Sequence, residues 1–217
     1  METYSLNEIE AMGKKATKGA GFHWGHAEEA GKAVRWLAQR NLPGPELLAS
    51  KLLQDDGIKH EDPSPIMVAG VWSVKFGRLC PIIMGSIMCD LATQFASDEK
   101  VGLGPIAYPL LLTPFVAAVS ELTSNVIQLS WEDVMISITP NECAFEGEYE
   151  ALTVNSTDFV TCRCANLEKP IEEKLENGCP IDPASWVQLN AFAYRTYAPA
   201  TEASRLSGAG AGVSDND

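Results

Sequence analysis

Positive charge is scarce in this sequence. Sixteen Lys and Arg residues stand against 29 Asp and Glu residues, which leaves a formal net charge of −13 at pH 7. No segment interleaves Lys and Arg with aromatic side chains, although a protein needs a basic face to bind nucleic acid or an anionic membrane. The composition therefore predicts a soluble, acidic protein with neither nucleic acid nor a membrane as its partner.

Signals for export and for membrane insertion are missing as well. The opening residues METYSLNEIE are acidic and lack the apolar stretch of a secretory signal, so we expect a cytoplasmic protein. The segment Val101–Ser120 carries no charge and is long enough to span a bilayer. It contains three prolines and two glycines, and we therefore expect it to form buried core.

The six cysteines show no CxxC spacing, which is a usual feature of zinc sites. Without an export signal, we expect free and buried thiols in a reducing compartment. Cys162 and Cys164 are two residues apart, so on a strand they would point to the same face. A metal site made of Cys162, Cys164 and Cys179 is the less favoured alternative.

Histidine is scarce, and nucleophile motifs such as GxSxG are absent. His23, His26 and Glu29 form an HxxHxxE pattern in which His26 and Glu29 would share a helical face, as a divalent metal requires. We favour a different interpretation, in which the acidic residues of this segment interact with the dipole at a helix start. The chain has only three histidines and no further ligand is evident, so the sequence names no cofactor.

The hydrophobic pattern predicts one domain over residues 1–217, helical at about 1–60 and mixed at about 61–217. Apolar residues at helical spacing predict helices at Ser5–Ala20, His26–Arg40, Pro45–Leu53, Cys80–Phe95, Thr113–Leu122 and Asp182–Tyr194. Alternating or continuous apolar runs predict strands at Ile106–Leu112, Val126–Trp131 and Val134–Thr139, and less cleanly at Phe145–Val154 and Asp158–Ala165. Ile66–Phe76 fits either type. We therefore expect an α+β fold with N-terminal helices, a central antiparallel or mixed sheet covered by helices, and a closing C-terminal helix before an ordered Gly-rich tail.

Local signals define several helix ends. Ser5 and Glu8 have the spacing of a capping box, and Asp182 precedes Pro183 in the manner of an N-cap. Thr113 is a further expected N-cap. Asp90 falls inside an apolar pattern, so we expect it to be buried with a partner, more often for a structural than for a functional reason.

The C-terminal run TEASRLSGAGAGVSDND provides the candidate site. Alternating glycines allow positive φ, and consecutive backbone N–H groups in such a turn can bind an anion beside an arginine. The expected substrate-binding residues are Arg205, Gly208, Gly210, Gly212 and Tyr197, and the expected acid/base or cation-binding residues are Glu202, Asp215 and Asp217. The alternative, which composition alone favours, is a flexible tail of small residues.

Two resemblances are visible. The runs Ala27–Gly31, Val34–Ala38 and Leu42–Gly44, together with the ending from Thr196 through Glu202–Arg205, Gly208–Gly212 and Asp215–Asp217, resemble an uncharacterised proteobacterial domain-of-unknown-function family over nearly the full length. Tyr4–Gly44 is also similar to the opening helix pair of the malate and L-lactate dehydrogenase-like oxidoreductases. Where that family has a turn with its catalytic histidine, this chain has Asn41–Gly44, so the resemblance implies no catalytic residue here.

The resulting functional hypothesis is a metabolic protein that handles a small anionic metabolite, either a carboxylate or a phosphate. We expect an enzyme or an enzyme subunit, although the sequence does not identify a reaction. The alternative is a non-catalytic subunit of an oligomeric assembly. A homo-oligomer is expected in both cases.

Overall fold

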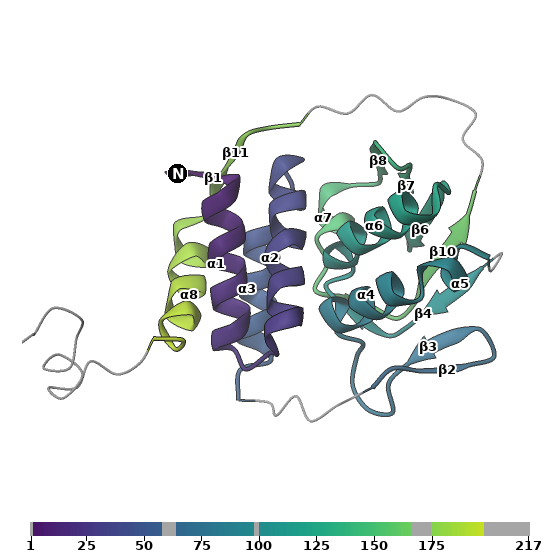
Figure 1. Ribbon diagram of the computed structural model, residues 1–217, viewed down its shortest axis with the longest axis horizontal. Helices are drawn as coiled ribbons and strands as arrows, with labels where there is room; N and C mark the ends of the chain where they lie inside the picture. Colours follow the sequence, from purple (N-terminus) through teal and green to yellow (C-terminus); the bar gives the residue numbers. More distant parts are fainter. Residues whose placement is uncertain (1, 58–63, 98–99, 166–174, 198–217) are drawn as a thin grey trace, which may run out of the picture.

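The computed structural model describes residues 2–57, 64–97, 100–165 and 175–197. Four helices form a bundle, here called the helical layer: α1 (Leu6–Gly19), α2 (Trp24–Gln39), α3 (Gly44–Gln54) and α8 (Pro183–Tyr194), with α3 behind α1 and α2 in Figure 1. The other half of the molecule contains a seven-stranded sheet and the helices α4 (Pro81–Asp90), α5 (Ala92–Ser97) and α6 (Thr113–Thr123). The chain begins in the helical layer, builds the sheet, and returns for α8. The expected α+β fold is thereby confirmed.

The large sheet is mixed, with the strand order β2-β3-β4-β10-β6-β7-β8. Its pairs are antiparallel except for β3 with β4, which is parallel. Its strands are β2 (Ile66–Val68), β3 (Val71–Ser73), β4 (Val101–Leu103), β6 (Ile127–Trp131), β7 (Val134–Ile138), β8 (Cys143–Glu146) and β10 (Val160–Cys164). Two small sheets pair β1 (Glu2–Ser5) with β11 (Gly178–Ile181) and β5 (Ile106–Ala107) with β9 (Ser156–Thr157). Helices α5 and α6 pack on the large sheet, and α2 meets both α4 and α6.

Local side-chain hydrogen bonds define the starts of α1 and α8. The backbone N–H of Glu8 donates to Ser5 Oγ at 3.3 Å, and the N–H of Ser5 donates to the Glu8 carboxylate at 2.9 Å. This is the predicted capping box. The N–H of Ser185 donates to the Asp182 carboxylate at 2.9 Å, which confirms the second predicted cap.

Several predictions for the centre of the chain were wrong. The single helix expected at Cys80–Phe95 breaks at Leu91 into α4 and α5, and Asp90 is exposed at the end of α4 rather than buried. The strand expected at Ile106–Leu112 is a two-residue strand followed by a 3-10 helix, Pro109–Leu112. Thr113 lies inside α6 after that 3-10 turn, and its buried hydroxyl has no hydrogen-bond partner in the part of the chain that the structure describes.

For three further segments, the structure either differs from the element expected from sequence or decides between two expected types. The ambiguous segment Ile66–Phe76 forms the hairpin of β2 and β3. The expected strand Phe145–Val154 divides into β8 and the short helix α7 (Tyr149–Leu152). Helix α2 begins at Trp24 rather than at His26, with His23 in the N-cap position. The ends of these elements differ from the expected ends because tertiary contacts, rather than the hydrophobic runs alone, determine where each one begins and ends.

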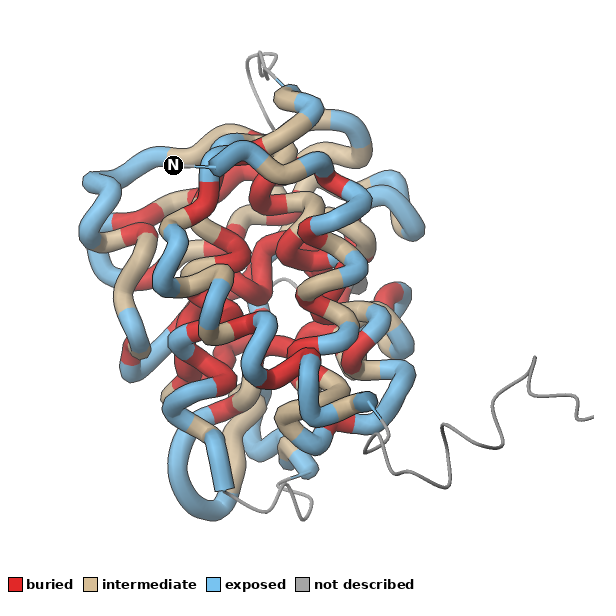
Figure 2. Tube along the Cα trace, turned by 90° about the vertical axis from the view of Figure 1, so that its left-hand side faces the viewer, coloured by how far each residue is buried: buried red, intermediate tan, exposed pale blue. Residues whose placement is uncertain are grey.

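The buried side chains form one contiguous cluster that joins both halves (Figure 2). It contains Leu37 and Leu48 from the helical layer, and Leu103 and Ile136 from the sheet. All six cysteines are free thiols, as expected, but only Cys143, Cys162 and Cys179 are buried. Among the described residues, no helix has the length and apolar character needed to cross a bilayer. The expected ordered tail lies outside the described residues.

Helices α1 and α2 make an unusually close contact through glycine. A Cβ placed on Gly31 would lie 2.7 Å from the backbone carbonyl oxygen of Glu10, and one placed on Gly13 would lie 2.7 Å from Val34 Cγ2. These distances are shorter than van der Waals contact, so only glycine permits this approach. At these two glycines there is consequently no space between α1 and α2.

Candidate functional site

The opposite side of α2 borders a cavity of about 220 Å³. The cavity lies between α2, the end of α4, one face of α6, and the turn that joins β7 to β8. We call it the α2–α6 cleft. Its lining residues are Glu29, Lys32, Ala33, Trp36, Arg40, Cys89, Pro114, Phe115, Ala117, Ala118, Glu121, Thr139, Pro140, Asn141 and Glu142.

The α2 wall of the cleft carries the cations. Glu29, Lys32, Trp36 and Arg40 follow one another at intervals of three or four residues, which places them on one helical face. The Arg40 guanidinium lies 3.6 Å from the centroid of the Trp36 ring, and it donates to the Trp36 carbonyl oxygen at 3.2 Å. The Lys32 ammonium donates to the Glu29 carboxylate at 2.7 Å, and this hydrogen bond raises the pKa of Lys32. Both cations are thereby held at the cleft.

The facing wall is apolar with a carboxylate rim. Pro114, Ala117, Ala118 and Glu121 lie on one face of α6, again at helical spacing. Glu142 belongs to the β7–β8 turn. Within the described residues, the carboxylates of Glu121 and Glu142 make neither a hydrogen bond nor an ion pair. They are the unpaired charges of the cleft.

Two local contacts fix the position of this wall. Gly85 on α4 has no Cβ, and the Phe115 ring of α6 occupies the space where a Cβ would lie. Thr139 Oγ1 accepts the backbone N–H of Glu142 at 2.9 Å and that of Asn141 at 3.3 Å, which closes the turn after β7. The carboxylate of Glu142 is therefore displayed by a constrained turn.

Cys89 is the thiol of the cleft. Its sulfur donates weakly to the Phe115 carbonyl oxygen at 3.7 Å. Burial raises the pKa of Cys89 to about 11, with smaller contributions from the negative charges of Glu29 and Asp90. At neutral pH the group is therefore a thiol rather than a nucleophilic thiolate. Within the described residues, the lining of the cleft contains no histidine that could act as a base toward this thiol.

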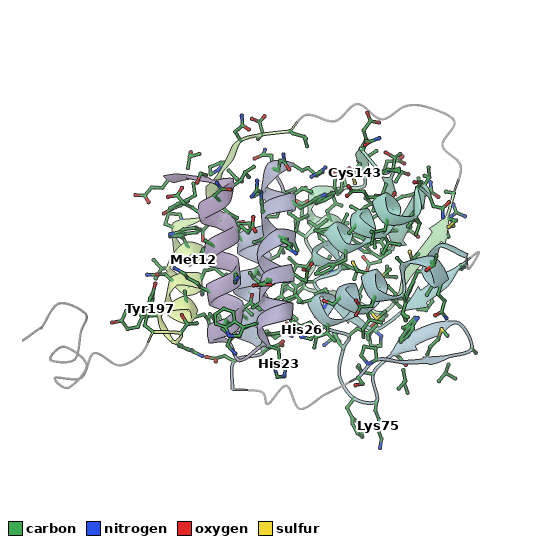
Figure 3. The ribbon with its side chains drawn as sticks, viewed as in Figure 1. Met12, His23, His26, Lys75, Cys143 and Tyr197 are labelled. Atoms are coloured by element: carbon green, nitrogen blue, oxygen red, sulfur yellow. The ribbon has the colours of Figure 1, made fainter. Side chains whose placement is uncertain are left out.

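Most of the site predicted from sequence lies outside the described residues. This applies to Glu202, Arg205, Gly208, Gly210, Gly212, Asp215 and Asp217, whose roles stay predictions. Tyr197 is described, and it lies at the outer end of the helical layer, away from the cleft (Figure 3). Its ring contacts Tyr194 edge-on at 5.7 Å, and Lys15 Nζ lies 5.9 Å from its centroid.

The possible metal ligands do not converge. His23 and His26 lie at the start of α2 (Figure 3), whereas Glu29 pairs with Lys32. Burial lowers the pKa of His26, the neighbouring His23 lowers it further, and Asp90 opposes both effects. In residues 2–57, 64–97, 100–165 and 175–197, no three His, Cys, Asp or Glu side chains are placed to hold one metal ion.

The sequence reasoning missed the cleft. The polar and aromatic face of α2 was visible as a pattern, since Lys32, Trp36 and Arg40 recur at helical spacing. What that pattern could not show is the opposite wall. Glu121 and Glu142 are far from α2 in sequence and approach it only through the packing of α6 and the β7–β8 turn.

Comparisons with known proteins give limited information. Residues 4–71 match the model of a family described as a protein of unknown function (DUF3726). This match confirms the expected similarity to a family of unknown function, and it spans α1 to the start of β3, so the C-terminal run lies outside it. No curated protein matches the chain in sequence.

One solved structure with some likeness is a malate dehydrogenase from Entamoeba histolytica. The two chains are 13% identical, with a TM-score of 0.43 over 67% of this chain. The matched part amounts to 49% of that enzyme, so the chain spans about half of its length. A likeness this weak supports no conclusion about activity.

Proposed function

We propose that this protein binds a small zwitterionic carboxylate, of the amino-acid type, in the α2–α6 cleft. The sequence predicted a small anionic metabolite. The proposal specifies a ligand that carries a positively charged group in addition to its carboxylate. The single observation that supports it is the arrangement of charge, with cations on the α2 wall and unpaired carboxylates on the facing wall.

Each wall suits one end of such a ligand. The carboxylate would bind Lys32 and Arg40, whose ammonium and guanidinium groups form charge-assisted hydrogen bonds with carboxylates. The amine would bind Glu121 and Glu142. The aliphatic part would lie against the apolar lining between them. A volume of about 220 Å³ restricts the ligand to a small molecule.

The cleft is a poor match for a ligand with only negative charge. Three carboxylates line it, at Glu29, Glu121 and Glu142, against the two cations of α2. A phosphate or dicarboxylate would approach both unpaired carboxylates, and like charges at such distances disfavour binding. A zwitterion satisfies both walls. The proposal concerns binding and assigns no reaction to the cleft.

The test is a matched ligand panel measured by isothermal titration calorimetry on the full-length chain. Each set contains an α-amino acid, the same molecule without its amine, and the same molecule without its carboxylate. One charge-assisted hydrogen bond contributes about 1.5–3 kcal/mol, so each truncated ligand should bind roughly 10–100-fold more weakly. Deaminated acids that bind as tightly as the amino acids would contradict the proposal.

Matched variants locate the ligand. Glu121→Gln should weaken the amino acid about tenfold and leave the deaminated acid unchanged, whereas Lys32→Gln should weaken both. The controls are Glu150→Gln on α7 and Lys75→Gln beyond β3, which make the same chemical changes on exposed residues outside the cleft. If the controls weaken binding as much as the cleft variants do, the ligand binds elsewhere.

A further inference from the structure

Helix α8 is uncharged along its whole length although it lies at the surface. It forms the outer edge of the helical layer (Figure 1), and its 12 residues, Pro183–Tyr194, include no Asp, Glu, Lys or Arg. Its inner face packs on α1 and α3 through Leu189, Phe192 and Ala193. A surface helix normally presents charged or polar residues on its outer face.

The outer face of α8 is a stripe of apolar side chains instead. Ala184, Val187, Ala191 and Tyr194 follow at intervals of three or four residues and all are exposed (Figure 2 views this side of the molecule). Val187 is 67% exposed and Tyr194 is 73% exposed. Exposed apolar side chains that follow one another along one helix face are suited to being covered by another surface.

We propose that a second copy of the chain covers this face, with the two α8 helices antiparallel about a two-fold axis. The stripe is complementary to itself in that arrangement. Tyr194, the largest residue, would lie against Ala184 of the second copy, and Val187 would lie against Ala191 of the second copy. The midpoint of 184 and 194 and the midpoint of 187 and 191 both fall at Leu189. One two-fold axis that passes beside Leu189 therefore produces both contacts. Such an isologous contact is the commonest form of homodimer.

Charge favours the same arrangement. Two copies with a net charge of −13 each repel one another, so their contact requires a surface without acidic residues, which α8 provides. Asp182 precedes the helix and Arg195 follows it. Antiparallel pairing brings Asp182 of one copy near Arg195 of the other, at both ends of the contact. Arg195 is held in position by a two-point ion pair with Asp56, at 2.6 and 2.9 Å.

The contact is small, which determines the expected affinity. A helix of 12 residues is roughly 18 Å long. One helix face of this length buries less than the roughly 800 Å² per partner of a standard interface. We therefore expect a reversible dimer with a dissociation constant on the order of 10 μM, which tightens with added salt as repulsion between the acidic copies is screened.

Sedimentation equilibrium of the full-length chain from about 1 to 300 μM tests the proposal directly. Val187→Glu places a like charge on both sides of the contact and should weaken the dimer more than tenfold. Leu122→Glu is the matched control, since Leu122 is an equally exposed apolar residue on α6, outside the stripe. A dimer that survives Val187→Glu would overturn the proposal and direct attention to another exposed apolar surface, such as edge strand β2.

A mixing experiment tests the register. Val187→Glu and Ala191→Lys should each be monomeric alone, and the two variants mixed should form a heterodimer because the new charges face each other across the contact. Mixed variants that stay monomeric would overturn the antiparallel register. A wild-type chain that stays monomeric up to about 300 μM would overturn the dimer itself. If Val187→Glu then also increases proteolysis within residues 198–217, the face binds the chain's own C-terminal segment instead.

Discussion

The two sides of α2 differ in how closely they are packed. Toward α1, Gly31 lies so near the backbone of Glu10 that no side chain fits between the helices. Toward α6, the same helix borders a cavity of about 220 Å³. The ionic contacts differ as well. Lys14 pairs with Glu28 at 2.6 Å across the α1–α2 contact, whereas Glu121 in the described part of the cleft has no partner.

This difference separates stability from function within one helix. Close packing and paired charges on the α1 side contribute to the folded state, and around Gly13 and Gly31 they leave no room for a ligand between the two helices. On the α6 side, a cavity lies between the elements, and within the described residues the carboxylates of Glu121 and Glu142 have no partner. A ligand could fill the cavity and pair with these carboxylates. Open space with unpaired polar groups is what a binding site requires, so the contrast supports the cleft as the functional surface.

The largest expected effect on the free energy of unfolding comes from adding a side chain at the close contact of α2 with α1. Gly31→Ala should lower the free energy of unfolding by up to about 2 kcal/mol, because overpacking costs about 1–3 kcal/mol and the gain in helix propensity offsets about 1 kcal/mol. Urea denaturation measures the change. Gly25→Ala is the matched control on the same helix, since a Cβ there would meet nothing within 4 Å. It should be neutral or stabilising by up to about 1 kcal/mol. Equal effects of both substitutions would show that the helix contact is not tight.

On the α6 side of α2, a substitution is expected to change stability only slightly but to abolish ligand binding. Ala118→Leu extends a side chain into the cleft, where space is present, so the free energy of unfolding should change by less than about 0.5 kcal/mol. The ligand-induced increase in melting temperature should disappear. Ala11→Leu, on the exposed face of α1, should retain it. A loss of stability comparable with that of Gly31→Ala would contradict the described difference between the two sides.

The smallest expected effect on the free energy of unfolding concerns Glu46, a buried carboxylate in the helical layer. Glu46 on α3 accepts the N–H of Asp182 at 3.0 Å, but its second carboxylate oxygen is buried without a partner in the described part of the chain. Burial raises the pKa of Glu46 above its ordinary value of 4.5, so ionisation opposes folding. The protonated form stabilises the fold at low pH, and this contribution is lost as pH rises through the raised pKa.

Glu46→Gln removes that titration. The stability of the wild type relative to Glu46→Gln should therefore decrease as pH rises from about 4 to 7, as measured by urea denaturation at each pH. Glu150→Gln provides the control, because it makes the same chemical change at an exposed carboxylate on α7, away from Glu46. A constant difference for Glu46→Gln would mean that the carboxylate is hydrated.

The accuracy of the sequence predictions follows the range of the interactions involved. The capping box of Ser5 with Glu8 and the hairpin of β6 with β7 were predicted correctly, because the groups that make them are close in sequence. The pairing of β1 with β11 was missed, since it joins residues 2–5 to residues 178–181. Asp90 was expected to be buried because its neighbours are apolar, yet the break at Leu91 exposes it.

What the sequence by itself determined is the α+β class, the positions of most helices, the free thiols, and the acidic net charge. These properties depend on composition and on patterns that repeat within a few residues. Only the tertiary structure decided which face of each helix is open. The α2–α6 cleft combines side chains from residues 29 to 142, and the bare stripe of α8 is recognisable only because its other faces are covered. The physical reason is that burial is a property of the packed molecule, and a local pattern shows which residues share a face without showing what lies against it.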